Sequence, residues 1–329
     1  MIGPHDVDAG RGLPGRRPPC AARRRRRRIR IVLGVLAALL VAGVVDTAVV
    51  AARVDRVDVD LTGGPGDSDG RTWVLVGLDS RDRLPAGADI RDFGTVEAVP
   101  DSRADVVVVV HQTDAGTTAL SVPRDVLVPS GRTADRLALS WLDGPQATVD
   151  ALCGLGIPTD HLVTVDLAGF AGTVDAAGGL DLDIPQPVRD RPAGLQIDSA
   201  GRQRVDGATA LALVRSRHPE HLVGGSWRPV PVDPDGRATA AATVLSALAD
   251  TAQRAALRPW RLQSLAWAAS GSLATDPATS LTELASLARA DLTHVGVLPV
   301  GDPVGATLAR LPTAETAAAV AAAGLSCER

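Results

Sequence analysis

The chain has 329 residues, 45% of them hydrophobic but only 2% aromatic, so a substantial core has to be built from Val, Leu and Ala. All 34 basic residues are arginine, which excludes a P-loop, a Schiff-base lysine and a Ser-x-x-Lys nucleophile. The formal net charge of −4 divides into +8 over residues 1–30 and −12 over the rest. An acidic body argues against nucleic acid as the main partner.

The N-terminal part of the chain has the pattern of a membrane anchor. Residues 1–30 form an Arg-rich tail, and the run from Arg23 to Arg28 directly precedes an apolar segment. That segment, residues 31–52, has 22 residues, about the length that spans a bilayer. The positive-inside rule places the tail in the cytoplasm and everything after about residue 53 outside, as a single-pass membrane protein.

Two other interpretations of this region stay open. The arginine run would also suit a nucleic-acid-binding arm, but its position before an apolar segment favours a topology signal. A cleaved signal peptide has similar flanks, but the apolar run is longer than a usual signal core, which favours a retained anchor. Asp46 interrupts the run two-thirds of the way along, where it would lie near the outer interface at reduced cost.

A linker and one domain are predicted after the anchor. Residues 53–71 are rich in Gly, Pro, Asp and Ser and read as the linker, and residues 72–329 as the domain. Its first strand, Trp73 to Gly77, runs directly into Asp79 and Arg81. Residues 82–104 follow as a polar loop.

A β-hairpin is the next predicted unit. Residues 106–110 form an unbroken valine run, residues 117–122 read as a second strand, and the segment between them has turn composition. A hairpin centred near Ala115 would bring Asp105 opposite Asp125, with Arg124 beside them, at one end of a rigid strand pair.

The remaining predicted elements mix helices and strands. Helices are expected at residues 135–155, 167–177, 206–214, 237–255, 258–270, 279–289 and 313–323, and strands at residues 162–165, 180–184 and 295–300. Strands interspersed with helices over about 250 residues predict a three-layer α/β/α domain with a mixed central sheet.

The three cysteines divide between two compartments. Cys20 would be cytoplasmic and reduced, whereas Cys153 and Cys327 would both be outside, where oxidation is possible. A disulfide that ties down the C-terminus and a pair of unbonded buried thiols are both compatible with the sequence.

Acids and arginines fall at the ends of several predicted elements. Carboxylates that converge without Cys or His suit a hard cation such as Mg²⁺, and converging guanidinium groups suit a polyanion. Together they indicate a metal-assisted phosphate reaction. Taken singly, the same residues could be turn caps, local ion pairs or a solvated helix end. The candidates are Asp79 and Arg81 after the first strand, Asp105, Arg124 and Asp125 at the hairpin end, and Arg215, Arg217 and Arg237 near two helix ends.

The order of these motifs resembles the LytR-CpsA-Psr family of cell-wall enzymes over roughly residues 73–255. The resemblance rests on the strings VLVGLDSR, ADVVVVV, ALSVPRD, GIPTDHLVTVDLAGFAGTVDAAGGLDLDIP and DGATALALVRSRH. It implies an α/β/α domain anchored outside the membrane. It also implies a Mg²⁺-dependent phosphotransferase that moves a glycopolymer from a polyprenyl-pyrophosphate carrier onto peptidoglycan.

The resemblance also implies a role for each candidate residue. Asp79 and Asp105 match the metal-linked acids, and Asp125 belongs to the same motif as Arg124. The lipid tail would enter an apolar cavity between sheet and helices. The arginines expected around the pyrophosphate are Arg81, Arg124, Arg215, Arg217 and Arg237, and catalysis would fall to Arg124, Asp125, Arg215 and Arg217.

The chain departs from the family pattern after the Arg-x-Arg-His string. The first arginine of the pattern is present as Arg237, but the aspartate that precedes it is shifted in position. Ala240 and Ala241 occupy the positions where the family usually has an Arg-Gln pair. Losing one phosphate-binding arginine would cost about 2–4 kcal/mol of transition-state stabilisation. The alternative function is therefore a catalytically weakened relative that binds polyprenyl phosphates as a carrier or assembly factor.

Overall fold

The computed structural model describes residues 20–61, 70–80, 102–130, 133–231, 233, 235–255 and 257–327. Arg81, most of the predicted loop 82–104 and residues 1–19 of the tail lie outside the described residues. The chain forms two compact units, Met1–Val49 and Val50–Arg329.

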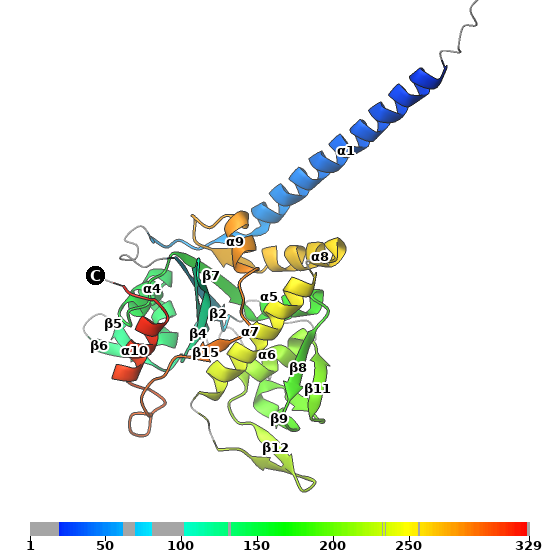
Figure 1. Cartoon of the computed structure of the whole chain (residues 1–329). Helices are drawn as coiled ribbons and strands as arrows, with labels where there is room; N and C mark the ends of the chain where they lie inside the picture. The colour runs from blue at the N-terminus through cyan, green and yellow to red at the C-terminus, as the bar shows by residue number, and fades with distance from the viewer. Residues whose placement is uncertain are drawn as a thin grey trace, which may run out of the picture. The chain divides into compact units, whose positions relative to one another are not determined.

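The first unit is built on one long helix. Helix α1 (Cys20–Arg53) includes the predicted apolar segment, and its part from Arg27 to Arg53 is long and apolar enough to cross a membrane (Figure 1). The protein buries no residue of its most apolar 18-residue window, although Val50, near the end of the helix, is buried. Length and composition therefore agree with the predicted span.

The second unit is organised around a seven-stranded mixed sheet with the strand order β1-β14-β7-β2-β3-β4-β15. Its neighbouring central strands β2, β3 and β4 are antiparallel, whereas β7 runs parallel to β2 and β15 runs parallel to β4. The strands are β1 (Asp55–Arg56), β2 (Arg71–Leu78), β3 (Ala104–Thr113), β4 (Gly116–Val122), β7 (His161–Asp166), β14 (Leu273–Thr275) and β15 (Val295–Val297).

Helices cover both faces of this sheet, which confirms the predicted three-layer α/β/α class (Figure 1). The helices of this unit are α3 (Leu137–Ser140), α4 (Pro145–Cys153), α5 (Leu167–Ala176), α6 (Gly207–Arg215), α7 (Gly236–Ala255), α8 (Pro259–Ser270), α9 (Leu281–Leu287) and α10 (Ala314–Ala322).

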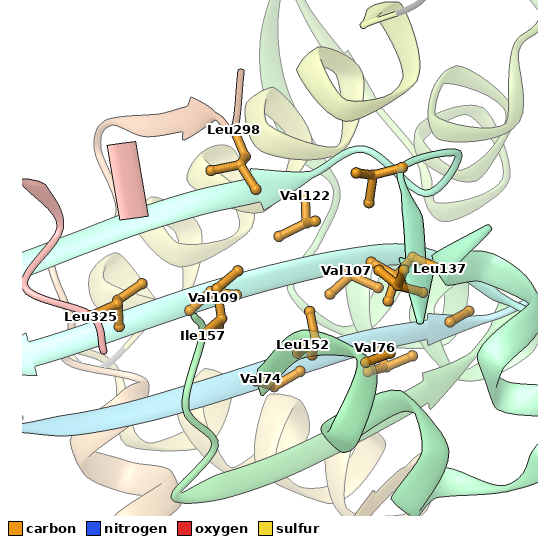
Figure 2. Close-up of a cluster of buried hydrophobic side chains, with 14 of the residues drawn as sticks. Val74, Val76, Val107, Val109, Val122, Leu137, Leu152, Ile157, Leu298 and Leu325 are labelled. Carbon is orange, nitrogen blue, oxygen red and sulfur yellow. The ribbon is translucent and has the colours of Figure 1, made fainter. Parts of the chain in front are cut away.

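The period-two alternation of the valine-rich strands divides the core into two layers. Val74, Val76, Val107 and Val109 face a cluster that includes Leu152 of α4, as Figure 2 shows. The alternate residues of the same strands, such as Trp73 and Val108, face α7 and α9. Aliphatic side chains make up most of each buried face, as the composition requires, and Trp73 is the largest side chain that is fully buried.

Smaller strands extend the fold beside the main sheet. A third apolar cluster packs α6 and α7 against β8 and β10. The small strands are β5 (Leu127–Ser130), β6 (Thr133–Arg136), β8 (Leu180–Ile184), β9 (Val188–Asp190), β10 (Leu195–Ile197), β11 (Gly201–Val205), β12 (Glu220–Val223) and β13 (Ser226–Pro229).

Three expectations about local structure differ from what is observed. The helix expected at 135–155 is interrupted at Gly144, where φ is +99° and Pro145 begins α4. Within the predicted linker, β1 pairs with β14. No strand was expected after Arg217, but β12 and β13 form a hairpin there, in a stretch with four prolines between residues 219 and 235.

A disulfide joins Cys153, at the end of α4, to Cys327 near the C-terminus. The two Cα atoms are 5.3 Å apart, within the usual range for such a bond. Of the two possibilities that the sequence left open, the structure therefore contains the bonded one.

Candidate active site

The two predicted metal-linked acids are brought together by a β-bulge between β2 and β3. Gly77 pairs with Val106 and Leu78 pairs with Ala104, so Asp105 is the extra residue on β3. The N–H groups of Asp79 and Asp105 both donate to the Arg103 carbonyl, each at 3.0 Å. The bulge thus fixes the two acidic residues at adjacent strand ends.

The hairpin register differs by one residue from the prediction. Thr113 pairs with Gly116 and Val107 pairs with Val122, so the turn has two residues and its centre lies before Ala115. Continued past Val122, this register sets Arg124 across from Asp105, and an ion pair joins Arg124 Nη1 to Asp105 Oδ1. The expectation that Asp125 lies opposite Asp105 is wrong, because a shift of one residue moves every partner along the strand.

Two further arginines reach the same carboxylate from other elements. Arg237, in the first turn of α7, places its Nη2 2.9 Å from Asp105 Oδ2. Arg217, which follows α6, places its Nη2 3.8 Å from the same oxygen. Three predicted pyrophosphate-binding arginines therefore surround one acid, although they are separated by up to 113 residues in the chain.

A buried acid that the sequence analysis missed holds the turn that carries Arg217. One carboxylate oxygen of Asp190 accepts hydrogen bonds from Ser216 Oγ at 2.8 Å, Arg217 N–H at 2.7 Å and His218 N–H at 2.8 Å. Asp190 ends a three-residue strand and carries no local sequence signal for this role. The backbone N–H groups of Arg217 and His218 lie beyond α6 and need acceptors from elsewhere in the chain, but this need does not identify Asp190 in the sequence.

The electrostatics of the cluster favour an ionised Asp105. Burial alone raises the pKa of the Asp105 carboxyl, but the charges of Arg237, Arg124 and Arg217 outweigh it and leave the pKa below its ordinary value. Burial and the neighbouring Arg237 and Arg124 lower the pKa of Arg217, while Asp105 and Asp79 raise it. A guanidinium remains charged at neutral pH, so the positive charge of the three arginines exceeds the single negative charge of the Asp105 carboxylate that they surround.

The other predicted site residues occupy different positions. Asp125 lies beyond Arg124, with Oδ2 3.6 Å from Arg124 Nε and Oδ1 3.2 Å from Arg136 Nη1. Arg215 is the last residue of α6, two residues before Arg217. Arg81 lies outside the described residues.

A pocket opens under this cluster. Its polar part contains Asp105, Arg124 and Arg237, and its floor is made of small apolar side chains. Ala241 lines this pocket at a position where the family pattern has a polar residue. The difference from the family pattern therefore lies inside the site. The lining residues are Asp105, Val106, Val107, Ser121, Val122, Pro123, Arg124, Asp125, Arg237, Ala238 and Ala241.

The donor set fits Mg²⁺ only together with a phosphate ligand. Among the residues that the structure describes, no three or more His, Cys, Asp or Glu side chains gather in a way that could hold a metal ion. Mg²⁺, however, is often held by one or two carboxylates, water and substrate phosphates. Asp79 and Asp105 supply such carboxylates, while the arginines that now pair with Asp105 would turn to the phosphates.

Comparison with known proteins gives a consistent result. A family model described as the LytR_cpsA_psr family matches residues 47–294. The probable cell wall biosynthesis protein LcpB of Corynebacterium glutamicum is 36% identical over 217 residues, which are 64% of this chain and 51% of that protein. The polyisoprenyl-teichoic acid–peptidoglycan teichoic acid transferase TagV of Bacillus subtilis is 29% identical over 141 residues, or 39% and 35% of the two chains.

The solved structure of a LytR-Csp2A-Psr enzyme from Actinomyces oris superimposes with a TM-score of 0.69 and 37% identity, and it covers 83% of this chain and 97% of its own. The chain spans about half the length, or less, of the curated relatives it matches, with 51% of LcpB and 35% of TagV covered. With a family model over most of its second unit and this structural match, the chain belongs to the LytR_cpsA_psr family.

Proposed function

We propose that the chain is a membrane-anchored phosphotransferase that attaches a glycopolymer from a polyprenyl-pyrophosphate carrier to peptidoglycan. The observation that carries this proposal is the convergence of Arg124, Arg217 and Arg237 on Asp105, beside a small pocket whose lining combines charged and small apolar side chains. Relatives named as teichoic acid transferases to peptidoglycan support the same class of reaction.

The three guanidinium groups suit a diphosphate in charge and geometry. Each presents a planar fork of N–H donors that matches phosphate oxygens. Arg237 also lies in the first turn of the 20-residue helix α7, where the helix dipole adds positive potential. Before substrate arrives, Asp105 would hold the three mutually repelling cations together, so little reorganisation is needed when phosphate replaces it.

In the proposed reaction, a peptidoglycan hydroxyl attacks the phosphorus that bears the glycan. The bond from this phosphorus to the bridging oxygen breaks, polyprenyl phosphate leaves, and the hydroxyl proton passes to water. Arg124, Arg217 and Arg237 stabilise the negative charge on the phosphoryl oxygens in the transition state. Mg²⁺, when held by Asp79 and Asp105, would neutralise further phosphate charge.

Membrane anchoring and an extracytoplasmic site are part of the same proposal. The apolar helix α1 and the arginine run before it support the topology. The Cys153–Cys327 disulfide is compatible with it, because such bonds persist in oxidising compartments.

The test incubates the full chain in liposomes with a polyprenyl-pyrophosphate glycan, peptidoglycan and Mg²⁺. We expect Arg124→Ala and Asp105→Ala to reduce transfer about 10²–10³-fold, as the loss of a transition-state charge contact does. Arg228→Ala removes an exposed arginine on β13 and should leave transfer unchanged. Unchanged transfer in Arg124→Ala would contradict the proposal.

The second candidate function, a lipid-binding carrier or assembly factor, is favoured by Ala240 and Ala241. Ala241 is buried at the floor of the pocket one turn after Arg237, so no polar side chain from this position reaches the phosphates. Tight polyprenyl-phosphate binding without transfer would support this candidate. Gain of transfer in an Ala240→Arg, Ala241→Gln double variant would then identify the missing pair as the cause.

A further inference from the structure

Helix α8 presents an aromatic face to its surroundings. Trp260 is 69% exposed, Trp267 is 45% exposed, and Leu257, just before the helix, is 85% exposed. The two tryptophans are seven residues apart, about two helical turns, so they share one face. Leu265 is buried and lies on the side of α8 that packs on the protein. The described part of the chain therefore leaves Trp260 and Leu257 largely uncovered and covers Trp267 only in part.

The same segment is cationic in an otherwise acidic domain. Between Asp250 and Asp276 the sequence has Arg254, Arg258 and Arg261 but no acidic residue. All three arginines are exposed. Residues 31–329 as a whole carry a net charge of −12, so this patch has the opposite sign to the domain around it. Tryptophan next to arginine is typical of segments that lie in a membrane interface.

The end of the apolar helix fixes where this face lies. Arg53 is the last residue of α1, one residue after the predicted membrane span, and it belongs to the second unit. Its guanidinium carbon lies 4.1 Å from the centre of the Trp267 ring. Arg53 Nε donates to Ser270 Oγ at 3.3 Å, and Nη2 donates to the Trp267 carbonyl at 3.4 Å. The α8 face is thus adjacent to the point where the chain leaves the apolar helix, whatever the orientation of the first unit.

Strand pairing connects this position to the candidate site. Leu273, three residues after α8, pairs with Val165, and Val165 pairs with Gly77, two residues before Asp79. Two strand spacings separate Leu273 from Gly77, about 10 Å. A bilayer surface at α8 would therefore lie within reach of the site that has to receive a lipid-linked substrate.

We propose that α8 docks on the outer leaflet of the membrane, with Trp260, Trp267 and Leu257 at the level of the headgroups and Arg258 and Arg261 on lipid phosphates. The inference rests on the proposed anchoring by α1, because the anchor keeps α8 at the surface. Docking fixes the tilt of the domain relative to the bilayer and so directs the mouth of the pocket towards membrane-embedded polyprenyl carriers.

The test uses the full chain in liposomes of phosphatidylcholine and anionic phosphatidylglycerol whose acyl chains carry bromine, which quenches nearby tryptophan fluorescence. We expect quenching in the wild type and its loss in the Trp260→Phe, Trp267→Phe double variant, since phenylalanine preserves the apolar contact but removes the signal. Trp227→Phe is the matched control, because Trp227 also stacks with an arginine, Arg189, but lies on β13. This control should keep the quenching of the wild type.

The outcomes separate the inference from the anchoring on which it rests. Chains that float with liposomes but show equal quenching in the wild type and the double variant would overturn the docking of α8 and leave the anchoring intact. Chains that do not float would overturn both. Tryptophans protected from aqueous acrylamide yet untouched by brominated lipid would indicate that a protein covers α8, which also overturns the inference.

Discussion

The carboxylate of Asp105 and the guanidinium of Arg237 meet at 2.9 Å although 132 residues separate them in the chain. Arg124 and Arg217 contact the same carboxylate, so one negative charge offsets the mutual repulsion of three positive charges. Asp105 thereby occupies the position of an anion among the arginines. The anion that the arginines would bind in its place is the pyrophosphate of the proposed substrate.

This relationship predicts the behaviour of an Asp105→Asn variant. Without the carboxylate, the guanidinium groups face one another, and we expect the free energy of unfolding to fall by about 3 kcal/mol. Inorganic pyrophosphate should then raise the unfolding temperature more in Asp105→Asn than in the wild type, because it supplies the missing anion to the folded state only. Thermal unfolding with and without pyrophosphate measures both effects.

The control is Asp114→Asn, which alters an exposed acid in the turn at the other end of the same hairpin. It should change neither the stability nor the pyrophosphate response. A larger pyrophosphate effect in the wild type than in Asp105→Asn would show that Asp105 does not occupy the anion position.

Arg310 stabilises the site from a segment beyond the residues that match the family model. Its Nε donates to the Gly301 carbonyl at 2.6 Å, its Nη2 donates to the Val300 carbonyl at 3.1 Å, and Nη1 pairs with Asp235. Its backbone N–H also donates to the Asp125 carbonyl at 3.0 Å. Arg310 therefore links the loop that carries Arg124 to the residues just before Arg237.

We expect Arg310→Ala to lower the free energy of unfolding by about 2 kcal/mol, because it leaves two half-buried carbonyl groups and the partly exposed Asp235 without their partner. Transfer measured well below the unfolding temperature should also fall about tenfold or more, since Arg124 and Arg237 lose their alignment. The matched control is Arg289→Ala, which removes an exposed arginine after α9. Equal transfer in both variants would limit Arg310 to a role in stability.

The disulfide predicts a redox-dependent stability. Cys153 and Cys327 enclose a loop with a sequence separation of 174, and closing a loop restricts the unfolded chain. We expect Cys327→Ser to lower the free energy of unfolding by about 2–5 kcal/mol. Dithiothreitol should lower the stability of the wild type to that of the variant and leave the variant unchanged. A wild type that is insensitive to dithiothreitol would contradict the prediction.

The parts of the fold that follow from local pattern could be predicted from the sequence. The valine run of β3 identifies a buried strand, and the alternation of helices and strands gives the layer architecture. The break before α4 could also have been predicted, because Gly144-Pro145 is a strong turn signal. The prediction of one long helix over residues 135–155 did not take it into account. The two-residue turn was harder, since a centre one residue away fits the same composition.

The contacts that assemble the site could not be predicted from local pattern. The bulge at Asp105 depends on how β2 and β3 are offset, which no residue near Asp105 specifies. Asp190 and Arg310 act through partners that are distant in the chain, and their own neighbours give no sign of them. The likeness of the motif order to a known family placed the arginines in one site before any geometry was known.

A last prediction concerns acid stability at the edge of the sheet next to the α1 exit. Asp276 is buried and accepts hydrogen bonds from the backbone N–H groups of Leu162 at 3.0 Å and Ala278 at 2.9 Å. Burial raises the pKa of Asp276, but the nearby His161 imidazole and the hydrogen bonds from Thr279 and the backbone outweigh it and lower the pKa to about 2. The Asp276 carbonyl also accepts from Arg56 Nη1 at 2.8 Å, which ties β1 to the sheet.

The sign of the pH effect follows from the lowered pKa. An unfolded aspartate has a pKa of about 3.9, so the folded state binds its proton less readily, and ionised Asp276 stabilises the fold above this pH. The stabilisation is lost as the pH falls from about 4 to about 2, and it amounts to about 2 kcal/mol. We therefore expect Asp276→Asn to be less stable than the wild type at pH 7 and the gap in unfolding free energy to narrow by about this amount near pH 2. Denaturant unfolding at several pH values measures the gap. A gap that stays constant from pH 7 to pH 2 would mean that the charge of Asp276 contributes nothing, and that only its shape and hydrogen bonds hold β7 to the loop after β14.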